Sequence, residues 1–169
     1  MSDIHEEIHD DDLEYEDHRE EVEVVEVGTH EKINHDLNGE IIVLEQGYVE
    51  LRLTTTHEMI ADDVGLIHGG FIFSSCDYAA MLAVNERNVV LVASNCQFLS
   101  PVKFRDEVKV VARVRHKEGR KRDVHVTAFV LDIKVFEGDF KTVVTERHVL
   151  KLQLLDDKDA TPTGESEVF

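Results

Sequence analysis

One stretch, residues 68–85, limits the fold of this chain more than any other part of its sequence. It reads HGGFIFSSCDYAAMLAVN, and its only acid is Asp77. The glycines near its start and the asparagines that follow predict a helix over 70–86. Because this helix is hydrophobic on every side, other parts of the structure have to cover it on every side.

The segments around this helix are rich in Val, Ile, Phe and Thr and predict strands. We expect strands over 40–45, 48–55, 89–99, 107–115, 123–136 and 141–152. Turns are expected at 46–47, 101–106, 117–121 and 137–139. Short connections between consecutive strands favour antiparallel pairing. The expected fold class is therefore α+β, with an antiparallel sheet wrapped around one long central helix.

A single twisted sheet covers about one side of a helix, so something else has to cover the remainder. We expect a second copy of the chain to do so, in a homodimer with an isologous interface. The sequence leaves a tetramer open. The uniformly apolar segment 89–92 is expected to lie at a covered position.

The charge distribution divides the chain into three parts. Residues 1–26 hold 13 acids and one base, so most of the net charge of −18 lies there. We expect an acidic, flexible arm over 1–27, one folded domain over 28–155 and a polar tail over 156–169. The strongly acidic balance argues against nucleic-acid binding, which needs a basic surface.

Other sequence features bear on the location of the protein. The first residues lack the basic and then apolar pattern of a signal peptide, and no apolar run is long enough to span a bilayer. The two cysteines, Cys76 and Cys96, form no CxxC motif. These features predict a cytoplasmic protein without a membrane partner.

Half of the basic residues in the chain lie between residues 103 and 122, where nine Lys or Arg accompany three acids. This concentration predicts a phosphate-bearing partner that is bound locally. The alternatives are a solvated strand edge, or a docking site for the acidic N-terminal arm. The candidate phosphate-binding residues are Lys103, Arg105, Arg113, Arg115, Lys117, Arg120, Lys121 and Arg122.

Asp77 is the strongest catalytic candidate. An ionised carboxylate is costly to bury unless something compensates it, and a carboxyl group in an apolar site has a raised pKa and is a better base. The alternative is a structural acid that is bonded to backbone or to a partner chain. The adjacent Cys76 has no evident base and is expected to be a small core residue.

Two segments together resemble a known family. They are GLIHGGFIFSSCDYAAMLAVN and SNCQFLSPVKFRDEVKVVARVRHKEGRKRDVHVTAFV, and the similarity extends over about 28–152. The chain resembles the hotdog-fold acyl-CoA thioesterases, most closely the PaaI-like type. The resemblance rests on Gly65, on the His68-Gly69-Gly70 motif, on Asp77 seven residues after the second glycine, and on the FLSPV turn.

This resemblance implies a hotdog fold and a dimer with two sites, each built from both subunits. It implies that Asp77 acts on the thioester as general base or nucleophile, with no cofactor or metal required and an acyl-CoA as ligand. The N–H of Gly70 or Phe71 at the helix start becomes the candidate oxyanion donor. His68 is expected either to contact the thioester or to hold the loop.

Asp62 departs from the family pattern, because related sequences often have Asn six residues before the histidine. An anion there would repel an attacking hydroxide and raise the pKa of a neighbouring acid. The first functional hypothesis is therefore an acyl-CoA thioesterase. The alternative is a non-catalytic acyl-CoA-binding sensor or regulator, and a dehydratase or hydratase on the same fold ranks last.

Overall fold

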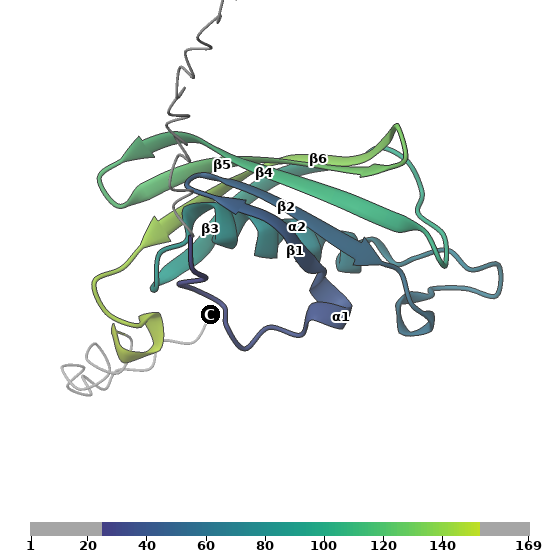
Figure 1. Ribbon diagram of the computed structural model, residues 1–169, viewed down its shortest axis with the longest axis horizontal. Coiled ribbons are helices and arrows are strands. Elements are labelled where there is room, and N and C mark those ends of the chain that lie inside the picture. Colours follow the sequence, from purple (N-terminus) through teal and green to yellow (C-terminus); the bar gives the residue numbers. More distant parts are fainter. Residues whose placement is uncertain (1–24, 153–169) are drawn as a thin grey trace, which may run out of the picture.

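The structure is a computed structural model that describes residues 25–152 (Figure 1). Nearly all of the expected acidic arm and the whole of the expected polar tail lie outside the described residues. The elements are α1 (His35–Asn38), β1 (Glu40–Glu45), β2 (Tyr48–Thr54), η1 (His57–Met59), α2 (Gly69–Val84), β3 (Val89–Phe98), β4 (Glu107–Glu118), β5 (Lys121–Val130) and β6 (Ile133–Val144).

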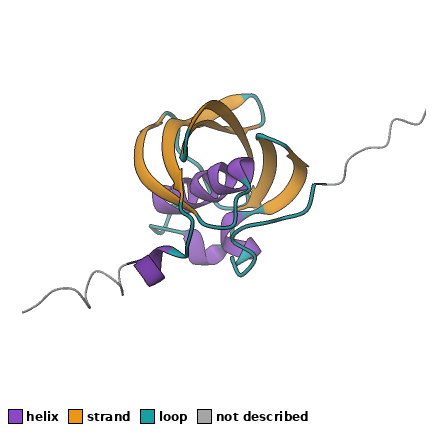
Figure 2. Cartoon of the chain, turned by 90° about the vertical axis from the view of Figure 1, so that its left-hand side faces the viewer, coloured by secondary structure: helices purple, strands orange, loops and turns teal. Residues whose placement is uncertain are grey.

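The six strands form one antiparallel sheet in the order β1-β2-β4-β5-β6-β3. The sheet arches over α2 (Figure 2), and alternate residues of β2, β4 and β5 are buried against the helix. Every residue of α2 from Tyr78 to Val84 is buried. The expected fold class, an antiparallel sheet wrapped around one central helix, is confirmed.

One side of α2 is closed by α1, a contact that the sequence did not suggest. Ser75 is fully buried in the middle of α2, and its hydroxyl donates to the carbonyl of Asn38 over 2.8 Å. The Ser74 hydroxyl donates to Oδ1 of the same asparagine over 2.5 Å. Since buried hydroxyls need partners, Asn38 allows two serines to lie within an otherwise apolar helix.

The two longest predicted strands were misplaced. The turn expected at 137–139 lies inside β6, and the chain turns instead at Leu131 and Asp132, where Leu131 adopts a left-handed conformation with φ of 52°. Strand β6 ends at Val144, and residues 149–152 form a helical turn rather than a strand. Gly138, between Glu137 and Asp139, suggested a turn, but the structure places it within β6, where its lack of a side chain matters for packing.

Gly138 lets β6 and β3 approach each other closely. It pairs with Cys96 of β3 and with Val126 of β5. A Cβ atom on Gly138 would lie 2.7 Å from Cβ of Cys96, closer than real Cβ atoms come. A glycine inside a strand commonly marks such an approach.

Strand β3 lies at one edge of the sheet, and its centre faces outward. Val92 is 58% exposed, and the next three residues are exposed as well. The segment 89–92, which we expected at a covered position, therefore lies at an edge within this single chain. A sheet edge presents backbone N–H and C=O groups that lack strand partners.

The Gly138→Ala variant is expected to lose about 1–3 kcal/mol of folding free energy, because its methyl group overlaps Cys96 in a packed sheet. Urea denaturation measures the loss. The Gly119→Asn variant is a suitable control, since that glycine has φ of 53° and open space around its Cβ position. Asparagine tolerates this conformation, so an equal loss in both variants would contradict the explanation.

Candidate functional site

Asp77 lies on the part of α2 that is not fully buried, and one of its carboxyl oxygens is withdrawn from solvent. Its Oδ1 atom is buried and has no hydrogen-bond partner among the described residues. Burial raises the pKa of this carboxyl to about 6. A carboxylate with such a pKa accepts a proton near neutral pH more readily than an ordinary aspartate does.

The start of α2 leaves one backbone donor available. The N–H of Phe71 donates to the carbonyl of His68 over 3.1 Å, so it is not free to bind a ligand. The N–H of Gly70 has no such partner among residues 25–152. Of the two expected oxyanion donors, only Gly70 is therefore in a position to act. Helix N-termini attract negative charge, which suits this role.

The His68 side chain lies over Gly70 rather than capping the helix. His68 occupies the N-cap position, and its side chain makes no capping hydrogen bond. A Cβ atom on Gly70 would lie 2.9 Å from Nε2 of His68, so a larger residue there would require the exposed His68 ring to shift. The main-chain N–H of His68 donates to the carbonyl of Met59 over 3.0 Å. The histidine thus holds the loop through its backbone, while its exposed ring occupies the space next to the Cα atom of Gly70.

Asp62 organises the loop before α2 and does not reach toward Asp77. Its Oδ1 atom accepts the backbone N–H groups of Val64, Gly65 and Leu66 over 3.0, 2.9 and 3.0 Å. These bonds hold the pKa of Asp62 below its ordinary value, with the Leu66 N–H contributing most. The expected effect of Asp62 on a neighbouring acid finds no support, because burial is the cause of the raised pKa of Asp77.

An apolar cavity of about 320 Å³ adjoins the start of α2. Phe98 forms part of its wall and packs against Gly69, where a Cβ atom would lie 3.0 Å from the Phe98 ring. A cavity of this size with apolar walls suits a hydrocarbon group. Its lining residues are Ile67, Gly69, Ile72, Phe98, Leu99, Ser100, Pro101, Val102 and Val135.

Within one chain, the helix separates Gly70 from Asp77. The two residues are seven positions apart in α2, which corresponds to about 10 Å along the helix axis. An oxyanion donor and a base that act on one carbonyl group each need to lie within about 3 Å of the reacting atoms. The pair therefore cannot serve the same carbonyl group from a single chain.

The structure does not bring the expected phosphate-binding residues together. Lys103 and Arg105 precede β4, beside the loop that Asp62 organises, because the Phe104 N–H donates to the Gly65 carbonyl over 2.8 Å. Lys117, Arg120, Lys121 and Arg122 lie in the hairpin between β4 and β5. Strand β4 has 12 residues, which is about 40 Å at ordinary strand rise. The two groups therefore lie at opposite ends of the sheet.

Two members of that set, Arg113 and Arg122, have local partners. The guanidinium of Arg113 lies over the Tyr48 ring, with 4.0 Å between Cζ and the ring centroid. Arg122 is buried, and its Nη1 donates to the carbonyls of Gly119 and Lys121 over 2.7 and 2.9 Å. Arg122 thus stabilises the hairpin turn and has little capacity left for a ligand.

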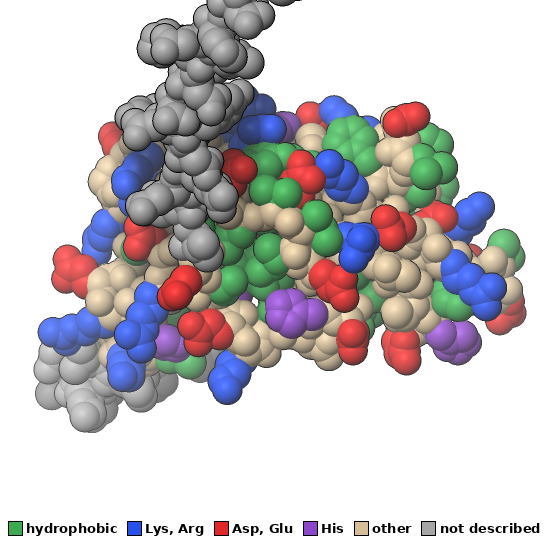
Figure 3. Space-filling view, in the orientation of Figure 1, with side chains coloured by type: hydrophobic (Ala, Val, Ile, Leu, Met, Phe, Trp, Pro, Cys, Tyr) green, Lys and Arg blue, Asp and Glu red, His purple; other side chains and the backbone are tan. Residues whose placement is uncertain are grey.

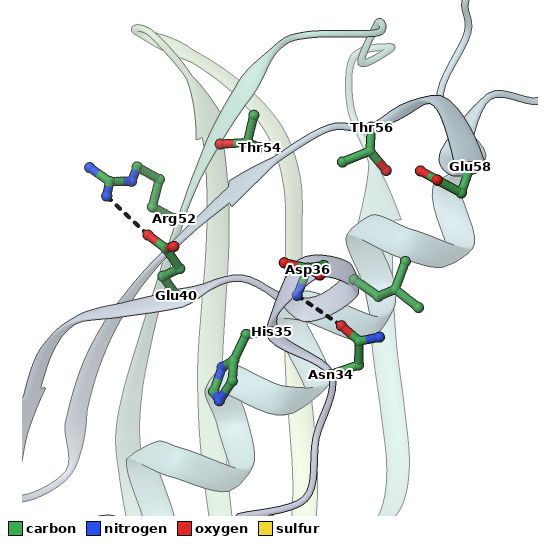
Figure 4. A pocket seen from close by; sticks show the side chains of 9 residues that line it. Asn34, His35, Asp36, Glu40, Arg52, Thr54, Thr56 and Glu58 are labelled. Atoms are coloured by element: carbon green, nitrogen blue, oxygen red, sulfur yellow. Dashed lines mark hydrogen bonds and ion pairs between the residues drawn. The ribbon is translucent and has the colours of Figure 1, made fainter.

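A separate polar pocket of about 480 Å³ lies beside α1 (Figure 4). Its charged groups partly neutralise one another, since Arg52 and Glu40 form an ion pair of 3.1 Å. None of the expected catalytic residues lines it. The lining residues are Asn34, His35, Asp36, Leu37, Glu40, Arg52, Thr54, Thr56 and Glu58.

Two classes of feature are absent from the described part of the chain. Across residues 25–152, no group of three or more His, Cys, Asp or Glu side chains is arranged to hold a metal ion. In the same range, no helix combines the length and the apolar composition needed to cross a membrane.

Curated sequences give two informative matches. One is methylthioribose-1-phosphate isomerase of Aquifex aeolicus, 50% identical over 119 residues, which are 70% of this chain and 26% of that protein. The other is the transcription factor FapR of a Thermoanaerobacter species, 29% identical over 67% of this chain and 57% of that protein. The chain therefore spans about a quarter of the first protein and just over half of the second.

Solved structures and a family profile agree on the fold. An uncharacterised protein of Pyrococcus horikoshii superposes with a TM-score of 0.73 at 43% identity, over 75% of this chain and 97% of that one. The smu.793 protein of Streptococcus mutans, solved with acetyl-CoA, has a TM-score of 0.63 at 24% identity, over 70% and 97%. The sequence profile of the thioesterase superfamily matches residues 64–137. This chain belongs to the thioesterase superfamily and has its hotdog fold.

Proposed function

We propose that this protein binds an acyl-CoA and hydrolyses its thioester, with Asp77 as the general base. The observation that carries the proposal is the Asp77 carboxyl, whose Oδ1 atom is buried without a partner among the described residues and whose pKa burial raises to about 6. A buried acid left without a partner is rare in proteins, and such groups gather at functional sites.

The proposed reaction has a simple balance. Asp77 takes a proton from a water molecule, whose oxygen attacks the thioester carbonyl carbon. The Gly70 N–H stabilises the negative charge that develops on the carbonyl oxygen. When the C–S bond breaks, Asp77 returns its proton to the departing sulfur, so that CoA leaves as the free thiol, the carboxylic acid is the second product and the Asp77 carboxylate is restored. The acyl chain occupies the apolar cavity behind Phe98 and Gly69.

We propose a homodimer as the working form, because each site needs groups from two chains. Since Gly70 and Asp77 are about 10 Å apart along one helix, Gly70 of one copy and Asp77 of the other would meet at the same carbonyl group. The exposed edge of β3 provides the surface through which two copies pair, edge to edge. Lys103 and Arg105, at the same end as Gly70, are the candidates for contact with CoA phosphates.

A second candidate function is that of an acyl-CoA-binding regulator without turnover. It is favoured by the likeness to FapR, a transcription factor that matches 67% of this chain. The two functions share the ligand and differ in the chemical step. Acetyl-CoA in the smu.793 structure supports the ligand for both, on a fold shared at 24% identity.

Hydrolysis of a panel of short, medium, long and aromatic acyl-CoAs tests the first function. The Asp77→Asn variant is expected to lower kcat about 10²- to 10⁴-fold while CoA-ester binding persists, because the amide fills the same space without accepting the proton. Asp132→Asn, at an exposed turn, is the matched control. Binding of the panel without turnover in the wild type would instead favour the regulator.

The raised pKa of Asp77 also predicts that the free energy of unfolding depends on pH. An aspartate in an unfolded chain has a pKa of ~3.9, so the folded protein with its value of about 6 holds this proton more tightly. The contribution of Asp77 to stability is thus greatest below pH ~4 and declines as the pH rises to about 6.

In a chain that is not bound to ligand, Asp77→Asn is therefore expected to raise the free energy of unfolding by about 1–2 kcal/mol near pH 7.5, with little change near pH 4. Urea denaturation at the two pH values measures the difference. An equal effect of the substitution at both values would show that the carboxylate is compensated in the folded protein.

Sedimentation velocity tests the homodimer. Val92→Glu places a charge at the exposed centre of β3 and is expected to shift the protein from dimer to monomer, because like charges would face each other across the joined edges. Leu131→Glu changes a residue that is 90% exposed at the turn between β5 and β6, and should leave the dimer intact. A monomeric wild type would contradict the proposal.

A further inference from the structure

The end of the molecule away from the start of α2 carries another hollow, which the proposed function does not use. It has a volume of about 630 Å³ and adjoins a smaller one of about 280 Å³. We call the two together the basic hollow. Its polar walls come from three separate parts of the chain and include Thr29, His30, Glu31, Lys32, Arg87 and His148.

Two asparagines that follow α2 hold these parts together. Asn85 ends the helix in a left-handed conformation, and its side chain accepts the Gly28 N–H and donates to the Glu26 carbonyl, both over 2.8 Å. The main-chain carbonyl of Asn88 accepts the backbone N–H of Thr145 over 3.1 Å. The segments before β1 and after β6 are thus fastened on either side of Arg87.

Both histidines are held through Nδ1. The Leu150 N–H donates to Nδ1 of His148 over 3.3 Å, so a neutral ring carries its proton on Nε2. Oγ1 of the buried Thr29 lies 2.8 Å from Nδ1 of His30, and a hydroxyl that donates there has the same effect. Burial lowers the pKa of His30, which favours the neutral ring. Each ring then presents an Nε2–H donor without needing to be charged.

The permanent charges of the basic hollow are mostly positive. Arg87 and Lys32 contribute cations, and Glu31 is the one acid in its walls. Within the described part of the chain, neither cation forms an ion pair. In Figure 3, blue side chains, with red ones among them, lie at the left-hand end of the visible face, the end where β6 stops and β3 begins in Figure 1.

We propose that the basic hollow binds the phosphate groups of a nucleotide. Guanidinium, ammonium and imidazole N–H groups are the donors that proteins use for phosphate oxygens. The smaller part of the hollow adds Val89, Val90 and Val149, which suit the uncharged base or sugar. A volume of a few hundred Å³ is ordinary for ligands of this size.

This site lies beyond the end of α2, about 10 Å along the helix axis from Asp77 of the same chain, and only its CoA source rests on the proposed function. It lies beyond the last residue of α2, and the 16 residues of that helix place it about 24 Å from Gly70 in the same chain. Two sources can supply the same phosphate chemistry, a free nucleotide and the nucleotide end of CoA. The experiment has to distinguish them.

Calorimetric titration of the full-length protein with ADP tests the proposal, with adenosine as the probe that lacks phosphate. Arg87→Gln and Lys32→Gln are each expected to weaken ADP binding about tenfold or more, because each removes a charged donor. Arg147→Gln is the matched control, since it removes the same charge from an exposed neighbour of His148 that does not line the hollow. It should leave ADP affinity unchanged.

A second titration with ADP in saturating CoA identifies the source. Retained ADP binding assigns the hollow to a free nucleotide, and its loss assigns it to the nucleotide end of CoA. The proposal is overturned if ADP does not bind at millimolar concentration, or if Arg87→Gln and Arg147→Gln weaken it equally. If ADP does not bind and Arg87→Gln also lowers the melting temperature, Arg87 pairs with acidic residues of the protein instead of with a ligand, which likewise overturns the proposal.

Discussion

The burial of α2 is the constraint on which the rest of this structure depends. A 16-residue helix with no charged residue except Asp77 has no face that suits water. The sheet therefore arches over it, and α1 closes a further side through Asn38. Asp77 is only partly covered, with one carboxyl oxygen buried, so the fold places one titratable group at the boundary between the apolar core and the outside.

The proposed chemistry follows from this boundary position. A carboxyl group deeper in the core would stay protonated, and one in water would keep an ordinary pKa and be a poor base. Between the two, desolvation brings the pKa of Asp77 to about 6, close to the pH at which a cell would use it. The apolar cavity and the free Gly70 N–H lie at the start of the same helix, so α2 carries the groups for both halves of the site that we propose two chains complete.

Much of the fold was predictable from local patterns, while contacts between distant residues were not. The apolar run gave α2 almost to the residue, and β-branched alternation gave β1 and β2. The turn between β5 and β6 was missed because Gly138 resembles a turn residue, whereas it is needed for the approach of Cys96 from another strand. Asp77 and Gly70 could be put forward as candidates from the sequence, and their roles stay predictions. The three N–H groups bound by Asp62 and the wide separation of the basic residues required coordinates.

Three structural requirements meet at Asn85, the residue that ends α2. Asn85 needs a left-handed backbone, an acceptor for Gly28 and a donor for Glu26. Glycine would supply the backbone alone, and aspartate would lose the donor. Only an amide on a short side chain meets all three requirements. The identity of this residue is therefore set by geometry rather than by any ligand, and a family-wide invariance at this position would carry no information about catalysis.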